Sequence, residues 1–292
     1  MSSADVLVPA AAFGPARTRH RGAFRRLYGG EMRLLLGRRR NQALLAVLAV
    51  VPIFIGVAVR ISTPRPGGDG PQFISQVTGN GLFLVFTALS VALPFFLPLV
   101  VGVVAGDSIA GEAGSGTLRY LLTVPVTRGR VLAVKTLGVA TFTALAVVAV
   151  AVTGLVMGAI LFGIHAITLL SGDTVSVGNG LLRTLGVCAY VTVAVFALAA
   201  GGLFVSTLTE NAIAAMATTI GLAVFSALLD AVPQLQAIHG WLLTHNWLGF
   251  GEFLRTSPDY TSLTHWTLLH AAYAAIFLSL AWSRLQTKDI TS

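Results

Sequence analysis

Charged side chains are scarce in this chain. Only 10% of its 292 residues are Asp, Glu, Lys or Arg, whereas 55% are hydrophobic. Soluble domains carry about 25% charged residues, and a chain so poor in charge cannot cover a water-exposed surface. The composition therefore excludes an ordinary soluble domain and predicts a protein whose main solvent is lipid.

Cysteine and lysine are almost absent. The single cysteine, Cys188, lies in an apolar run, so no intramolecular disulfide can form, and we interpret this residue as a small buried apolar side chain. Only two of the 19 basic residues, Lys135 and Lys288, are lysines. With many Ala, Gly and Val residues, this bias is typical of a GC-rich bacterial genome. We therefore expect a multi-pass protein of the bacterial plasma membrane.

Six stretches lack charge and are long enough for membrane spans, which require about 20 residues. We predict an all-α polytopic membrane protein whose transmembrane domain covers residues 41–284. Its predicted helices cover about 41–60, 81–106, 132–163, 181–207, 211–231 and 265–284.

Proline interrupts two of these predicted helices. Pro52 lies in the first, and Pro94 and Pro98 lie four residues apart in the second. Each proline removes a backbone donor and tends to bend a helix. However, membrane helices carry proline more often than soluble helices do, so we expect no mechanical role for these residues.

The basic residues predict the orientation of the chain. Six spans place both termini on one side, which would carry fifteen basic residues, nine of them arginines within 17–40. The other side would carry only Arg60, Arg65, Arg183 and Arg255. Because basic residues concentrate on the cytoplasmic side, we predict that both termini are cytoplasmic. Residues 1–18 are predicted to be a disordered cytosolic tail, and residues 285–292 a second cytosolic tail.

Residues 19–40 combine basic and apolar side chains with the helical period. The apolar ones are Phe24, Leu27, Tyr28, Met32, Leu35 and Leu36, and the opposite face carries Arg25, Arg26, Glu31, Arg33 and Arg38. This pattern predicts an amphipathic surface helix bound to the lipid of the inner leaflet. The net charge of +8 is thus placed for a membrane surface, and no nucleic acid is expected. A simple anchor and an element that transmits force both remain open.

The segment 107–135 is too polar and too rich in glycine to span a membrane, and too short to form a domain. Asp107 and Glu112 come first, and glycines follow at 114 and 116. Residues 117–122 then form a short helix with an apolar face, which ends at Pro125. A short amphipathic helix on the cytosolic face is suited to docking a soluble partner.

The order Asp-x-x-x-x-Glu-x-x-x-Gly-Thr-Leu, followed by Leu-Leu-Thr-x-Pro-Val-x-Arg, resembles one loop of a known family. This loop joins helices two and three in ABC transporter permeases of the type-2 class. The six-helix layout and the surface helix resemble that class too, and the likeness covers about residues 20–290. In the family this loop is a coupling helix that contacts the ATPase. The resemblance assigns that contact to Asp107, Glu112, Gly116, Thr117, Leu118, Leu121, Leu122, Pro125 and Arg128.

The resemblance also implies partners and a transport role. Family members pair with a second permease copy or paralogue and with cytosolic ABC ATPase subunits, which hold ATP and Mg²⁺. They are exporters, and the small outer loops here favour a drug-like or lipid-like substrate. The chain itself is not expected to be an ATPase or to hold a cofactor. Its closest approach to a P-loop, residues 129–136, has Val134 where the second glycine is needed.

Two other functions remain as alternatives. An ion-gradient-driven transporter or channel is disfavoured because no carboxylate is expected near the membrane midplane. A membrane enzyme could use the histidines, Glu252 and Asp259 of the last outer loop, 231–265, where we also predict short interfacial or re-entrant helices. No metal site is expected, because no two histidines are spaced i, i+4. The four outer histidines are His239, His245, His265 and His270, and the last of these is expected to reach water at a span end.

Small residues indicate where helices approach closely. One group, 199–202, lies in the fourth predicted helix. A second group comprises Ala212, Ala214 and Ala215 in the fifth. Packing within one subunit explains both groups most simply, and the resemblance makes the second group the better candidate for a dimer contact.

Overall fold

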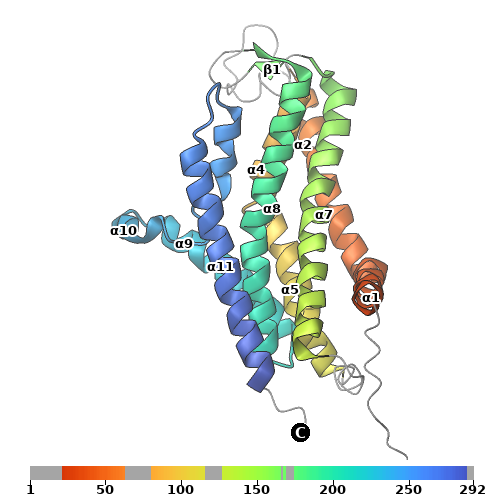
Figure 1. Cartoon of the computed structure of the whole chain (residues 1–292). Helices are drawn as coiled ribbons and strands as arrows, with labels where there is room; N and C mark the ends of the chain where they lie inside the picture. The colour runs from red at the N-terminus through yellow and green to blue at the C-terminus, as the bar shows by residue number, and fades with distance from the viewer. Residues whose placement is uncertain (1–21, 63–79, 116–126, 166, 169–173, 288–292) are drawn as a thin grey trace, which may run out of the picture.

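A computed structural model describes residues 22–62, 80–115, 127–165, 167–168 and 174–287. In these ranges the chain is all-α, apart from a small antiparallel hairpin of β1 (Ile167–Thr168) and β2 (Thr174–Val175). Six helices are long and apolar enough to cross a membrane (Figure 1). They are α2 (Arg39–Ile61), α5 (Phe96–Gly114), α7 (Arg128–Phe162), α8 (Val177–Leu208), α9 (Ala212–Asp230) and α11 (Tyr260–Thr287).

The remaining helices are short or lie beside the bundle. The first helix, α1 (Ala23–Gly37), precedes α2 and crosses its end at an angle (Figure 1). An apolar helix of 11 residues, α4 (Leu82–Ala92), precedes α5. Between α9 and α11 lie η1 (Pro233–Leu235), α10 (Gln236–His239) and η2 (Trp247–Leu254). The end of the bundle where α1 lies and α11 finishes is called the basic end below.

The apolar residues divide into a buried core and an exposed belt. Most residues of α4 and α5 and half of those of α8 are buried, whereas α2, α7, α9 and α11 leave large apolar side chains exposed. Phe54 is 74% exposed, Ile160 is 69% exposed and Phe225 is 61% exposed. Such a surface is stable only in an apolar solvent. The chain is therefore a polytopic membrane protein, as its composition predicts.

The second predicted span, 81–106, is broken in the structure. α4 ends at Ala92, α5 begins at Phe96, and Pro94 lies between them. Proline lacks the amide hydrogen that would bond the carbonyl of Ser90, and its ring crowds that carbonyl. The predicted bend of this span is therefore confirmed at Pro94. Pro52, by contrast, lies inside the uninterrupted α2.

Helix boundaries also differ from the predicted ones in three places. α5 continues to Gly114, so the first residues of the predicted polar loop are helical. α7 begins at Arg128 rather than near 132, and α11 begins at Tyr260 rather than near 265. The surface helix occupies Ala23–Gly37, within the predicted 19–40. The predicted tail 1–18 and the predicted helix 117–122 lie outside the described residues.

At the end opposite the basic end, polar side chains connect the loops to the helices. Asn80 accepts a hydrogen bond from the Leu82 amide and donates one to the His165 carbonyl, with distances of 3.0 and 2.8 Å. Arg183 of α8 donates to the carbonyls of Phe253 and Arg255, both at 2.6 Å. These bonds fix α4 to the α7–α8 connection, and η2 to α8.

Asp259 forms the start of α11. Its carboxylate accepts hydrogen bonds from the Ser262 hydroxyl, at 2.5 Å, and from the amides of Thr261 and Ser262. These donors, the Ser262 hydroxyl first, hold the pKa of the Asp259 carboxyl below its usual value. This carboxylate therefore acts as a helix cap.

Small residues allow α5 and α9 to touch closely. A Cβ added at Gly106 would lie 2.6 Å from the backbone nitrogen of Met216, and one added at Gly102 would lie 2.9 Å from the Ile220 side chain. Ala215 and Thr219 face this contact and are fully buried. Ala215 thus packs within the subunit, as do the buried residues 199–202 of α8. Ala214 remains exposed.

Gly106→Leu should destabilise the bundle, because its side chain would collide with the α9 backbone. We expect a loss of about 1–3 kcal/mol in unfolding free energy, the usual cost of overpacking. Thermal unfolding of the purified protein in detergent measures this loss. Gly221→Leu is the matched control, because a Cβ there meets nothing within 4 Å. Equal melting temperatures for the two variants would contradict the close contact.

A buried charge cluster as candidate functional site

The surface helix α1 packs along the start of α7. Leu35 of α1 is buried, while Leu27, Tyr28 and Met32 are half-buried. The hydroxyl oxygens of Tyr28 and Thr141 lie 2.7 Å apart. Phe24, Arg25 and Arg26 are exposed. The predicted amphipathic division thus holds for most of this helix; the exceptions are Phe24, which is exposed although it was placed on the apolar face, and Glu31, described below.

The joint between α1 and α2 is held by amide side chains. Arg38 has extended backbone angles, which end α1. Asn41 and Gln42 then donate hydrogen bonds to the carbonyls of Leu35 and Leu36, both at 2.8 Å. These carbonyls belong to the last turn of α1, where no intrahelical donor remains. Two side chains from the first turn of α2 therefore cap α1 and fix the angle between the helices.

Asp107 of α5 stabilises the joint between α1 and α2 through ion pairs. Its carboxylate pairs with Arg38, and with Arg40 at 2.6 Å. Asp107 is 8% exposed, whereas both arginine side chains are more than 40% exposed. The carboxylate is thus buried and compensated by two cations that reach outward. Arg40 also donates to Asn41, at 3.3 Å, and so joins the ionic and capping contacts.

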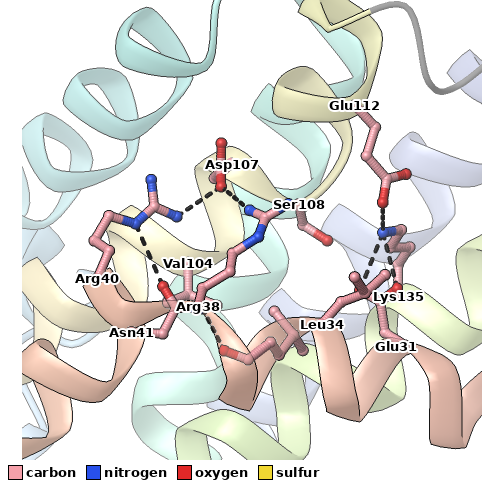
Figure 2. A pocket seen from close by; sticks show the side chains of 11 residues that line it. Glu31, Leu34, Arg38, Arg40, Asn41, Val104, Asp107, Ser108, Glu112 and Lys135 are labelled. Carbon is pink, nitrogen blue, oxygen red and sulfur yellow. Dashed lines mark hydrogen bonds and ion pairs between the residues drawn. The ribbon is translucent and has the colours of Figure 1, made fainter.

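A second set of charges lies deeper between α1, α5 and α7. The ammonium group of Lys135 donates to both carboxylate oxygens of Glu31, at 3.0 and 2.9 Å, and to the carboxylate of Glu112 (Figure 2). All three residues are at most 8% exposed. Burying an unpaired charge costs several kcal/mol, so these three side chains stabilise one another only as a group.

We call these six residues the charge cluster: Glu31, Arg38, Arg40, Asp107, Glu112 and Lys135. Three are acidic and three are basic, so their charges cancel when all are ionised. Figure 2 shows them converging from α1, α2, α5 and α7. The cavity between them has a volume of about 10 Å³, which is room for one water molecule at most. The cluster therefore joins helices and leaves no space for a substrate.

The predicted partner-binding residues fall into two groups. Asp107 and Glu112 were expected on an exposed loop, but both are buried in the charge cluster. Arg128 donates to the carbonyls of Leu285 and Gln286, at 3.0 and 2.8 Å, and so contacts the end of α11. The others lie outside the described residues; these are Gly116, Thr117, Leu118, Leu121, Leu122 and Pro125.

Four members of the charge cluster were missed as site residues: Glu31, Arg38, Arg40 and Lys135. Glu31 was placed on the solvated face of the surface helix, and that assignment was wrong, because it is buried against Lys135. The sequence holds one signal for this role. Glu31 is the only acidic residue within 17–40, among nine arginines, and Lys135 stands just before a long uncharged run. A single acidic residue among arginines and a single lysine at the start of a membrane span indicate that these two charges pair with each other.

The segment between α9 and α11 forms short helices, as the sequence predicts. Trp247 of η2 is buried, whereas Trp241 is 70% exposed. Glu252 pairs with Arg255 at 3.3 Å. His270 was expected to reach water but is 1% exposed and packs edge-on against Tyr190. That expectation was wrong, because η2 and its flanking turns cover this part of α11.

Lys135→Met should strongly destabilise the protein, because it leaves Glu31 and Glu112 buried without a cation. We expect a loss of about 3–5 kcal/mol, measured by thermal unfolding in detergent. The control combines Glu31→Leu, Glu112→Leu and Lys135→Met, which removes all three charges. Apolar replacement of a whole buried group is often neutral, so this triple variant should regain most of the loss. A single variant as stable as the parent protein would refute the buried pairing.

One family model, described as a protein of unknown function (DUF2705), matches residues 43–291. The match covers every candidate span but the first four residues of α2. No curated protein matches the chain. Since the family model covers well over half of the sequence, the chain belongs to the DUF2705 family, as a multi-pass membrane protein with six candidate spans.

Proposed function

We propose that this chain is the permease subunit of an ATP-driven ABC transporter of the type-2 class, coupled to a separate cytosolic ATPase. The loop motif between Asp107 and Arg128 supports the assignment by resemblance. One structural observation carries it further. Lys135 of α7, the helix that leaves segment 116–126, pairs both with Glu31 of the surface helix α1 and with Glu112 of α5, the helix that enters the segment.

This arrangement suits a lever that converts a displacement of the loop into movement of the spans. Glu112 lies two residues before the end of α5, and Lys135 lies in the second turn of α7. Both contact each other, and Lys135 contacts Glu31. Breaking a buried pair costs about 3–5 kcal/mol, whereas an exposed pair contributes about 0–1 kcal/mol. A force on the loop would therefore reach α1 and, through Asp107, α2.

The remaining parts of the proposal follow from the resemblance and the charge pattern. The basic end faces the cytoplasm of a bacterial cell, with α1 against the inner leaflet. ATP and Mg²⁺ bind to the partner ATPase. A second permease copy or paralogue completes the pathway, through which a drug-like or lipid-like substrate is exported.

Leu121→Asp should prevent the ATPase from co-purifying with the permease, because it places a charge on the apolar face of the predicted coupling helix. The partners to test are the ABC ATPase subunits of the same genome, each co-expressed with the permease, and co-purification from detergent-solubilised membranes is the measurement. Leu181→Asp is the matched control, since Leu181 is exposed at the opposite end of the bundle. Glu112→Arg is unsuitable, because it would disrupt the buried cluster.

Undiminished co-purification of the Leu121→Asp variant would reject the docking role of this segment. Transport into ATP-free vesicles, driven by a proton or sodium gradient, would instead favour the ion-gradient alternative. Loss of activity on changing Glu252, with ATPase binding intact, would favour the membrane enzyme.

A variant of the charge cluster should distinguish binding of the ATPase from the coupling of ATP hydrolysis to transport. In the triple variant of Glu31→Leu, Glu112→Leu and Lys135→Met, the predicted docking segment is unchanged, so the ATPase should still co-purify. Transport per ATP hydrolysed should fall, because the ion pairs that join α7 to α1 and to α5 are gone. Reconstituted vesicles measure both quantities. Transport per ATP equal to that of the parent protein would exclude a coupling role for these ion pairs.

A further inference from the structure

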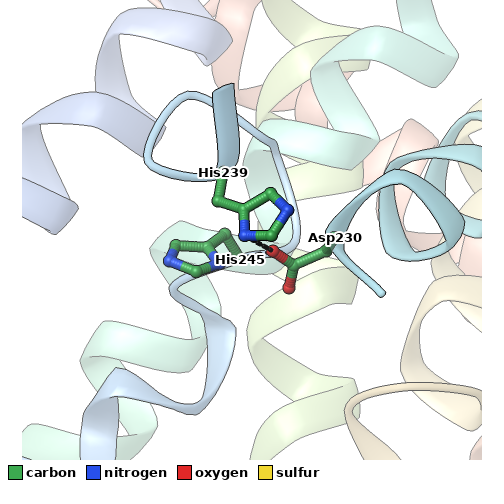
Figure 3. A group of neighbouring side chains, drawn as sticks. All are labelled: Asp230, His239 and His245. Carbon is green, nitrogen blue, oxygen red and sulfur yellow. Dashed lines mark hydrogen bonds and ion pairs between the residues drawn. The ribbon is translucent and has the colours of Figure 1, made fainter. Parts of the chain in front are cut away.

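Three polar side chains meet at the end of α9. Asp230 is the last residue of α9, His239 is the last residue of α10, and His245 lies in the turn before η2. Both imidazole rings approach the same carboxylate oxygen (Figure 3). The Nδ1 atom of His245 lies 2.5 Å from Oδ1 of Asp230, and Nδ1 of His239 lies 3.8 Å from it. One ligand atom from each residue lies within 4.8 Å of the others.

The hydrogen bonding of His239 leaves a lone pair directed at the carboxylate. Its Nε2 atom lies 3.1 Å from the carbonyl oxygen of Val232. A carbonyl can only accept a hydrogen bond, so Nε2 carries the proton, and Nδ1 of the neutral ring carries the lone pair. This lone pair faces Asp230 Oδ1 at 3.8 Å, which is too far for a hydrogen bond. Two electron-rich atoms that face each other without a proton between them repel each other. A cation bound between them would relieve this repulsion.

The same contact is typical of a metal-binding histidine. Such a ring usually donates its other N–H to a carboxylate or a backbone carbonyl, which fixes its tautomer and orientation. Val232 supplies that carbonyl here, two residues after Asp230 in the chain. The carbonyl also accepts the Leu235 amide at 3.0 Å, so η1 holds it in place.

The position of His245 is fixed from α9 itself. Ser226 lies one helical turn before Asp230, and its hydroxyl oxygen lies 2.9 Å from that of Thr244. The Thr244 amide donates to the same Ser226 oxygen at 3.2 Å. Ser226 is 5% exposed. A buried hydrogen-bonded pair therefore holds the residue next to His245 against the helix that carries Asp230.

We propose that Asp230, His239 and His245 form a binding site for a divalent transition-metal ion, Zn²⁺ in the first place. Two imidazole nitrogens and one carboxylate oxygen suit zinc, whereas Mg²⁺ and Ca²⁺ prefer oxygen ligands alone. Zinc bonds of about 2.0–2.1 Å place tetrahedral ligand atoms about 3.3 Å apart. On zinc binding, the distance from Asp230 Oδ1 to Nδ1 of His239 would decrease, and that to Nδ1 of His245 would increase, each by less than about 1 Å.

The site has an entry path and an open coordination position. The side chains of Asp230 and His245 are 29% and 35% exposed, and that of His239 is 16% exposed. Three protein ligands leave the fourth tetrahedral position for water or an anionic group. Metal binding would join the end of α9 and the turn before η2 to α10, which Figure 1 shows leaning out beside the bundle.

The test uses the full-length protein, purified in detergent with a tag that contains no histidine and stripped of metal by a chelator. Calorimetric titration with Zn²⁺ should show one ion per chain, and Co²⁺ should give the visible absorption bands of a tetrahedral site. Zn²⁺ should also raise the melting temperature, whereas Mg²⁺ should not. These measurements need neither ATP nor a partner subunit, so they are independent of the transport proposal.

Variants locate the site. His245→Ala and Asp230→Asn should each weaken Zn²⁺ binding by at least about tenfold, and the combination of His239→Ala with His245→Ala should abolish it. His265→Ala is the matched control, because His265 is exposed on α11 and outside the cluster. The metal-free melting temperature of each variant reports whether it folds. Absence of saturable Zn²⁺ binding by the parent protein would overturn the proposal. Full binding by the double histidine variant would also overturn it.

Discussion

A lysine ammonium group cannot remain buried beside lipid without a counter-charge, and this constraint organises the basic end of the molecule. Lys135 lies within α7 at 4% exposure, so carboxylates must reach it from other helices. Glu31 requires α1 to lie against α7, and Glu112 requires α5 to remain helical beyond its apolar part. Asp107 imposes a similar requirement on the joint between α1 and α2. Ion pairs thus join four helices from three separate parts of the sequence.

The same physics explains which parts of the fold the sequence predicts. Long uncharged stretches identify the six spans, because length and apolarity alone decide membrane insertion. The end of α5 was misplaced because Asp107 and Glu112 were taken to end a span. A charge ends a span when it would face lipid, but these two face cations within the protein. The effect of Pro94 also depends on packing, since Pro52 leaves α2 uninterrupted and Pro94 does not.

The candidate sites depend on contacts between elements, and the sequence predicts them less well. Periodicity places Glu31 on the polar face of α1, and only the approach of α7 shows that this face is covered. The outer histidines were judged by spacing within one helix, although His239, His245 and Asp230 come from three different elements. A rule for ligands on one helix cannot detect a group assembled by turns.

The break at Pro94 divides the second crossing of the membrane into two rods. α4 is 11 residues long, or about 16 Å at 1.5 Å per residue, and it lies largely buried among its neighbours. α5 carries Asp107 and Glu112 at its other end. Because no continuous hydrogen-bonded backbone joins these two rods, the direction of each is set by its own neighbours. The second crossing of the membrane is therefore built from two helical segments, of which only α5 carries charge.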